Sequence, residues 1–281
     1  MDSDDDTPRP PSAFALAWRQ TLRDFRAGEL RLLLVAVTLA VGALTAVGFF
    51  ADRLERSLAR DARQLLGGDA IVSSDRQTPQ AFIDEARRRG LQVATTTGFP
   101  SMGRAPDDKG GASKLVAVKA VSDGYPLRGR LKLRHAPDAP ERDSAGAPEP
   151  GTVWVDASLL DNLQLKMGDT LLLGDAALKI ARIVAVEPDR GAGFSSFSPR
   201  VMLGHGDLAA TQLIQPASRV SYRLAVASPA GRDADVSAFV RWAEEQIAKQ
   251  PLRGVRVESM ESGRPEMKQT LDRAKKFLNL V

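Results

Sequence analysis

The chain has 281 residues, a formal net charge of +4 and 43% hydrophobic residues. This is enough for one large domain or two small ones with a hydrophobic core. There is no cysteine, which excludes disulfide frameworks, thiolate metal sites and thiol catalysis. The only two histidines, His135 and His205, leave little room for a histidine-rich metal centre. The sequence has neither basic stripes with aromatic platforms nor a P-loop, so we predict no nucleic-acid binding and no ATP hydrolysis by that route.

A long uncharged segment lies near the N-terminus. Nineteen residues without a charge run from Leu32 to Phe50, and as a helix they extend roughly 28 Å, close to the hydrocarbon thickness of a bilayer. A signal peptide is the alternative, because Ala46-Val47-Gly48 resembles a cleavage site. The apolar run is longer than a signal core and follows thirty-one residues, which favours a retained transmembrane helix.

The residues before this span predict an interfacial amphipathic helix over 13–28, after a disordered tail over 1–12. Aromatic and aliphatic side chains share one helical face with arginines beside it, a pattern typical of helices at the membrane surface. The residues concerned are Phe14, Trp18, Leu22, Phe25, Arg19, Arg23 and Arg26. Arginines flank the span on both sides, so charge counting leaves its orientation open, and the basic helix favours a cytoplasmic N-terminus.

Within the span, Ala36 and Ala40, and Gly42 and Ala46, have small-xxx-small spacing. This spacing lets a second helix approach closely in lipid, although alanine and glycine are also common in membrane helices. Beyond Phe50 the apolar periodicity continues to Leu65 and stops at Gly67-Gly68. We therefore predict one helix over 30–66 that leaves the bilayer as a stalk.

Short strands and helices alternate after the stalk. We predict strands over 69–73, 91–97, 114–121, 153–155, 170–173, 178–186, 201–203, 220–226 and 255–257. Helices are predicted over 78–89, 157–163 and 235–249, with a short one near Leu208. Gly174-Asp175 is a favourable hairpin turn, and 135–150, rich in proline and charge, predicts a mobile surface loop. The pattern favours an α+β domain over 69–262, of mixed α/β type and built from two small subdomains.

The C-terminal residues 264–281 predict another helix. It begins at Pro265, and its apolar positions lead into Asn279-Leu280-Val281. An amphipathic terminal helix is one interpretation. We favour the start of a second stalk and transmembrane helix that is truncated at Val281.

The segment EPDRGAGFSSFSPR, from Glu187 to Arg200, is the most distinctive local motif. Ser195 and Ser196 lack a nucleophile elbow, and Gly191-x-Gly193 lacks a dinucleotide fingerprint. We interpret the segment as a structural loop in which Asp189 and Arg190 bond the backbone. Its structural residues are Glu187, Pro188, Asp189, Arg190, Gly191 and Gly193. Asp156 and Asp161 are expected to cap and flank the helix over 157–163, and we predict no catalytic, cofactor-binding or metal-binding residue.

The order of several segments resembles the first half of MacB/FtsX-type ABC transporter permeases, and more narrowly their YbbP-like branch. The resembling segments are LLLVAVTLAVGALTAVG, DARQLLGGDAIVSS, KAVSDGYPLRG, EPDRGAGFSSFSPR, LIQPASRVSYRL and RPEMKQTLDRAKKFLNL. The resemblance implies a MacB-like periplasmic core domain between the first two spans of a bacterial inner-membrane protein, with a cytoplasmic N-terminus.

The resemblance also implies a non-catalytic function and a set of partners. The chain would couple ATP hydrolysis by a separate cytoplasmic ABC ATPase to movement of its periplasmic domain, for export or extraction of an envelope or hydrophobic substrate. A permease dimer, membrane lipids and a periplasmic esterase or thioesterase are the other implied partners, and no cofactor is implied. Such permeases have several more spans, so we expect a fragment. The alternatives are a single-span tethered binding module and a membrane-anchored hydrolase that uses Ser195 or Ser196.

Overall fold

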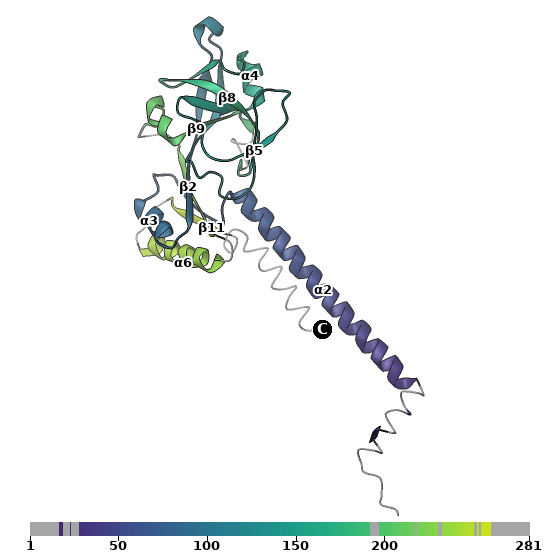
Figure 1. Ribbon diagram of the computed structural model, residues 1–281. Coiled ribbons are helices and arrows are strands. Elements are labelled where there is room, and N and C mark those ends of the chain that lie inside the picture. Colours follow the sequence, from purple (N-terminus) through teal and green to yellow (C-terminus); the bar gives the residue numbers. More distant parts are fainter. Residues whose placement is uncertain are drawn as a thin grey trace, which may run out of the picture. The chain divides into compact units, whose positions relative to one another are not determined.

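The computed structural model describes residues 17–18, 23, 28–191, 197–216, 218–229, 232–249, 252 and 254–259 (Figure 1). The chain divides into two compact units, Met1–Leu58 and Ala59–Val281. Most of the predicted interfacial helix, all of the predicted C-terminal helix, and Gly193, Ser195 and Ser196 lie outside the described residues. Of the seven residues named for the interfacial helix, Trp18 and Arg23 are described, and both are helical.

The first unit consists mainly of helix α2, Glu29–Leu66, whose last turns belong to the second unit. Every side chain from residue 32 to residue 50 is exposed, and the segment Arg31–Leu54 is long and apolar enough to cross a membrane. The hydroxyls of Thr38 and Thr45 each donate to the carbonyl oxygen four residues earlier, at 2.7 Å. The helix therefore satisfies its own polar groups, as a helix in lipid must.

The described residues of the second unit form a mixed sheet of eleven strands, most of them paired antiparallel. The strand order is β11-β1-β10-β2-β3-β9-β6-β8-β4-β5, and β7 pairs with both β2 and β8. The strands are β1 Ala70–Ser74, β2 Gln92–Arg104, β3 Ser113–Val121, β4 Leu131–Arg134, β5 Arg142–Ser144, β6 Thr152–Val155, β7 Thr170–Leu173, β8 Ala176–Val186, β9 Arg200–Gly204, β10 Ser221–Ala227 and β11 Arg256–Ser259.

Because β7 joins β2 to β8, six strands form a closed ring, in the order β2-β3-β9-β6-β8-β7. Helix α4, Ala157–Leu163, follows β6. Leucines of α4, including Leu159 and Leu163, share one buried apolar cluster with Val116, Ile180 and Leu203 from the ring strands. Closing the ring removes free sheet edges.

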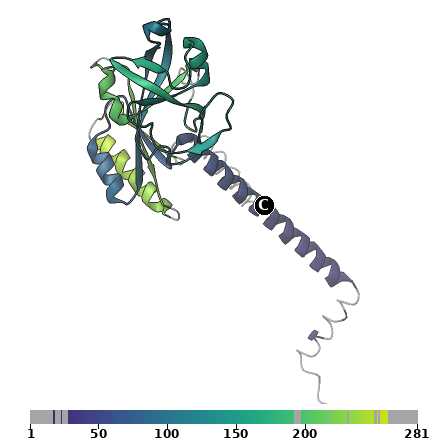
Figure 2. The same ribbon diagram turned by 45° about the horizontal axis from the view of Figure 1, so that its top comes forward.

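The other half of the sheet is covered by helices α3, Gln80–Arg88, and α6, Asp233–Lys249, which lie side by side on one face (Figure 2). Phe82 of α3 and Trp242 of α6 meet edge to face with ring centroids 5.2 Å apart. Beneath them, Val72 and Leu224 point into the same apolar cluster. Ile71 and Ala225, the neighbours of these two residues in their strands, belong to a different cluster on the opposite face of the sheet, as strand alternation requires.

The two halves share strand β2, which has thirteen residues. Its first part pairs with β10 and its later part with β3 and β7. The predicted α+β fold in two parts is thus confirmed, with a helix-covered sheet and a closed strand ring on one continuous sheet. Strand β2 is longer than predicted, because Gly98, Pro100 and Gly103 lie inside a strand although they read as turn residues.

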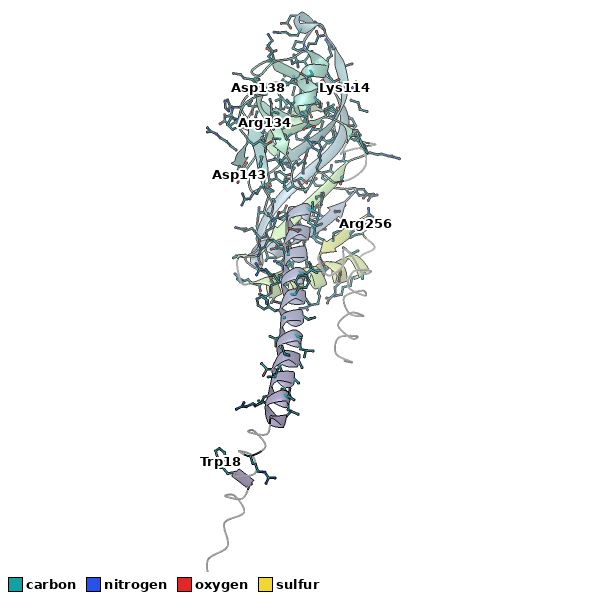
Figure 3. All side chains as sticks on the ribbon, turned by 90° about the vertical axis from the view of Figure 1, so that its right-hand side faces the viewer. Trp18, Lys114, Arg134, Asp138, Asp143 and Arg256 are labelled. Carbon is teal, nitrogen blue, oxygen red and sulfur yellow. The ribbon has the colours of Figure 1, made fainter. Side chains whose placement is uncertain are left out.

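The predicted surface loop over 135–150 contains structure that the sequence did not indicate. Residues 142–144 form β5, which pairs with β4. Arg134, Asp138 and Asp143 lie along this segment in Figure 3, and Arg134 bonds Glu141 at 2.6 Å. Gly146 donates its backbone N–H to the Tyr125 carbonyl at 2.7 Å, which ties the end of the segment to the domain.

The predicted hairpin between β7 and β8 is confirmed, and its turn contacts a distant segment. Gly174 has a φ of +59°, and the N–H of Asp175 donates to the carbonyl oxygen of Thr211 at 3.0 Å. A Cβ built on Gly174 would lie 2.0 Å from that oxygen. The turn therefore requires glycine both for its conformation and for the close approach of this backbone.

Gly174→Ala should destabilise the domain by at least about 2 kcal/mol more than Gly110→Ala, because overpacking adds to the backbone strain. Gly110 is a matched control, since its φ is +90° but nothing lies within 4 Å of a built Cβ. Urea unfolding in neutral detergent, followed by tryptophan fluorescence, measures both free energies. Equal losses would show that the contact with Thr211 has no role.

Candidate functional site

The loop that follows β8 returns into the interior of the domain and brings two carboxylates to Lys119. The lysine lies in β3, and its Nζ bonds Glu187 Oε1 at 2.8 Å and Asp189 Oδ1 at 2.8 Å. All three residues are at least nine-tenths buried. A charged lysine in a buried strand requires such partners, because desolvation without them is costly.

Tyr125 and Arg200 complete this group, which we call the buried ionic cluster: Lys119, Tyr125, Glu187, Asp189 and Arg200. Lys119 Nζ lies 3.0 Å from the Tyr125 hydroxyl and 4.5 Å from the centroid of its ring. The Tyr125 hydroxyl donates a short hydrogen bond to Asp189. Arg200 of β9 donates from Nε to Glu187 Oε2 at 2.7 Å.

The electrostatics hold Asp189 charged and Tyr125 neutral. Burial, together with the charges of Asp189 and Glu187, raises the pKa of Tyr125 well above its usual value. Burial also acts to raise the pKa of Asp189, but the charge of Lys119 and the hydrogen bonds from Lys119 and Tyr125 outweigh it, and the pKa is lowered. The phenol therefore remains a donor and the carboxylate an acceptor.

Arg190 and Asp156 extend the cluster toward helix α4. Arg190 donates to both Asp156 oxygens, at 2.6 and 3.2 Å, and to the carbonyl of Ser198 at 3.2 Å. This hydrogen bonding raises the pKa of Arg190. Asp156 also accepts from the backbone N–H of Arg200 at 2.9 Å, and its side chain makes no cap bond to α4. Asp156 occupies the N-cap position of α4, as predicted, but its side-chain oxygens are bonded to distant donors instead of to the helix.

The end of helix α2 lies directly against this loop. Leu66 packs on the apolar cluster that contains Tyr125, and the Gly67 carbonyl accepts from the Arg128 N–H at 3.2 Å. A Cβ built on Gly67 would lie 3.3 Å from the Asp189 side chain. One built on Gly129 would lie 2.5 Å from Pro188 Cβ and 3.0 Å from the Gln64 carbonyl oxygen. The loop, the helix end and the segment after Tyr125 thus meet at van der Waals distance.

A second set of ion pairs fixes the same helix end, and we call it the stalk junction: Arg63, Asp69, Arg128 and Asp233. Arg63 lies 3.1 Å from Asp233 of α6 and 3.8 Å from Asp69. Asp69 accepts both donors of the Arg128 fork, at 2.9 and 2.7 Å. The last turns of α2 are therefore bound to β1 and to α6.

The arrangement suits positioning better than catalysis. The carboxylates of Glu187 and Asp189 both face Lys119, so neither is an unpartnered acid or base. His205 lies 3.4 Å from the Thr97 hydroxyl, and burial lowers its pKa. The described residues contain no group of three or more histidines or carboxylates that could hold a metal ion.

The sequence identified the loop but not its partners. Asp189 bonds the side chains of Tyr125 and Lys119, 64 and 70 residues away, rather than the local backbone as predicted. Lys119, Tyr125 and Arg200 were not predicted as site residues. Lys119 was detectable in principle, since a lysine within the apolar run KLVAVKAV requires a buried partner.

Comparison with known proteins identifies a relative that matches most of the chain. No family model matches the chain. It is 32% identical, over 258 residues and 92% of its length, to the uncharacterized ABC transporter permease YbbP of Escherichia coli (strain K12). This chain is homologous to an ABC transporter permease. The matched part is 30% of that permease, and the resemblance predicted from the sequence is confirmed.

Solved structures with a similar fold include the periplasmic region of MacB from Actinobacillus actinomycetemcomitans. It is 10% identical, with a TM-score of 0.43, and the match covers 75% of this chain and 95% of that one. The extracellular domain of the noncanonic ABC-type transporter YknZ from Gram-positive bacteria is 8% identical, with a TM-score of 0.41. That match covers 68% of this chain and all of the other.

Replacing Lys119 with methionine should destabilise the domain by about 3–5 kcal/mol, because Glu187 and Asp189 then remain buried without the positive charge of the lysine. Lys114→Met on the same strand is the control, since Lys114 is exposed (Figure 3), and it should change stability by less than about 0.5 kcal/mol. Urea unfolding at pH 7 gives both values. Similar losses in the two variants would contradict a special role for Lys119.

The cost of Lys119→Met should depend on pH. In the wild-type chain the lowered pKa of Asp189 contributes stability that is complete above the unfolded value of about 3.9 and is lost as the pH falls through the folded pKa. Without Lys119, burial favours the protonated form of Asp189. Protonation of Asp189 at low pH therefore removes the buried, unpaired charge that destabilises the variant. The difference in unfolding free energy should therefore shrink as the pH falls from 7 toward 4. A constant difference would contradict this coupling.

Proposed function

We propose that this chain forms the first membrane helix and the outer domain of an ABC transporter permease in a bacterial inner membrane. Homology to a permease along 92% of the chain supports the proposal, as does the exposed apolar helix α2. The role is transport without catalysis in this chain. The N-terminus lies in the cytoplasm and residues 69–262 lie outside, as a periplasmic core domain.

The proposed mechanism rests on the contacts between the C-terminal end of helix α2 and the outer domain. Its last turn contacts the buried ionic cluster through Gly67 and is held by Arg63 in the stalk junction. The loop that Gly67 contacts is held by the buried ion pairs of Lys119 with Glu187 and Asp189, and charge-assisted hydrogen bonds of this kind are strong. A shift of residues 59–66 would therefore move the loop after β8, strand β1 and helix α6 together rather than be absorbed locally.

In this proposal the force comes from a cytoplasmic ABC ATPase. Nucleotide-driven movement of the membrane helices reaches the outer domain through the stalk, a rigid-element transmission of the kind seen in other switching proteins. A second permease copy and the chain beyond residue 281 complete the transport unit. The transported molecule is an envelope or hydrophobic compound, and a periplasmic esterase or thioesterase acts beside it.

Breaking the helix between the span and the domain should uncouple the two. Arg56→Pro removes a backbone hydrogen bond within α2 and clashes with the carbonyl of residue 52, at a cost of about 3 kcal/mol or more. Arg56→Ala removes only the ion pair with Asp52, which is 3.0 Å long, and serves as the control. Both variants should insert in the membrane and retain a folded outer domain.

The readout is ATP-dependent movement in the parent permease with its ATPase. The present chain lacks cysteine, so spin labels at Asp138→Cys and Leu44→Cys report one distance. Both positions are exposed. We expect the distance to change with ATP in the wild type and in Arg56→Ala, but not in Arg56→Pro. A parent permease that never co-purifies with an ABC ATPase would refute the proposal and favour a tethered binding module.

A further inference from the structure

A cavity of about 610 Å³ opens beside the buried ionic cluster, at the point where the two halves of the sheet meet. This volume is in the range of sites that hold small molecules. Four neighbouring strands contribute to it: β10, β2, β3 and β9. Arg223 lies opposite Thr96, and Gly98 lies opposite both Ser221 and Lys119, so these residues share one face of the sheet.

The cavity is basic on its β10 side. Five cationic side chains line it, with the two carboxylates Asp75 and Asp189. Glu187 and Asp156 neutralise Arg200 and Arg190, and Lys119 faces Asp189. The positive charge that remains comes from Arg219 and Arg223.

These two arginines are only weakly engaged. Arg223 lies 3.8 Å from Asp189 Oδ2, beyond hydrogen-bond distance, while Asp189 already accepts from Lys119 and Tyr125. Arg219 is exposed and forms no ion pair with any residue in the described part of the chain. Asp75 is the only further carboxylate among the described lining residues. The guanidinium groups of Arg219 and Arg223 are therefore available to an anion.

The other lining groups indicate what kind of anion fits. Thr96 and Ser221 place hydroxyl-bearing side chains in the wall, while Pro100 and Ala117, which lie opposite each other on the same face as Gly98 and Lys119, supply an apolar part. Two arginine forks and two hydroxyls offer more donors than the two oxygens of one carboxylate accept, whereas a phosphate group presents more acceptor oxygens. At Gly98, the nearest atom to a built Cβ is a carbonyl oxygen at 3.8 Å, so the floor is open.

We propose that this cavity binds the phosphate group of an amphiphilic molecule, with the phosphate on Arg219 and Arg223 and the apolar part against Pro100 and Ala117. The site differs from the stalk junction and needs neither an ATPase nor movement of the stalk. Its failure and the failure of the coupling role are therefore separate results.

The test is isothermal titration calorimetry on the purified full chain in a neutral maltoside detergent, with protein-free micelles as the blank. The probes are dihexanoyl phosphatidylglycerol, dihexanoylglycerol and inorganic phosphate. We expect saturable binding of the phospholipid, at least tenfold weaker binding of dihexanoylglycerol, and weakening by salt. Binding of inorganic phosphate as tightly as the lipid would support the phosphate site, with free phosphate as its ligand, and would overturn the apolar contact.

Variants locate the binding. Arg219→Gln combined with Arg223→Gln should weaken phospholipid binding at least tenfold. Arg219→Gln alone, at an exposed position where folding is not at risk, should weaken it by about threefold or more. Gly98→Val narrows the floor and should weaken the lipid more than inorganic phosphate. Arg256→Gln removes an exposed charge from β11 outside the cavity (Figure 3) and should change affinity less than twofold.

Three results would overturn the inference. One is the absence of saturable binding of either phosphate probe. Another is equal affinity for dihexanoylglycerol and the phospholipid, since phosphate would then not be recognised. The third is an unchanged affinity in Arg219→Gln, and in the double variant when its unfolding midpoint matches that of the wild type.

Discussion

The buried lysine of strand β3 imposes the constraint on which the rest of the domain depends. Lys119 is nine-tenths buried and bonded to two carboxylates that lie 68 and 70 residues later in the chain. Leaving either side of such a group unpaired costs several kcal/mol. The loop after β8 must therefore close over β3, and β9 must follow beside β3 so that Arg200 reaches Glu187.

This constraint connects the fold to the proposed role. The loop that carries Glu187 and Asp189 contacts the end of helix α2 at Gly67 and, through Pro188, the backbone at Gly129. The helix end is also paired with Asp69 and Asp233, on the helix-covered half of the sheet. One helix end thus contacts both halves of the domain, which is the geometry that a stalk needs to move them together. The phosphate-binding cavity that we propose has both Lys119 and Asp189 in its lining.

Local patterns predicted most of the regular structure. Helix α4 and strand β7 have the predicted bounds, and β8 and α6 begin two residues earlier than predicted. Strands β4 and β5 were not predicted, because β4 alternates over only four residues and β5 contains no apolar residue. The extension of β2 was not predicted either, because Gly98, Pro100 and Gly103 indicate a turn when each is considered with its neighbours alone, whereas pairing with β3 and β7 keeps the backbone extended.

The sequence by itself determined the membrane-length helix, its stop at Gly67, the α+β class and the position of the loop motif, because periodicity and turn chemistry depend on neighbouring residues. Only the tertiary structure decided what the polar residues do. Asp156 is the N-cap residue of α4, but its side chain binds Arg190 and the backbone of Arg200 instead of the helix. Asp189 was expected to bond backbone and instead binds Lys119 and Tyr125. Charge pairing of this kind depends on which strands become neighbours in the sheet, and strand order is set by packing over long distances in the chain.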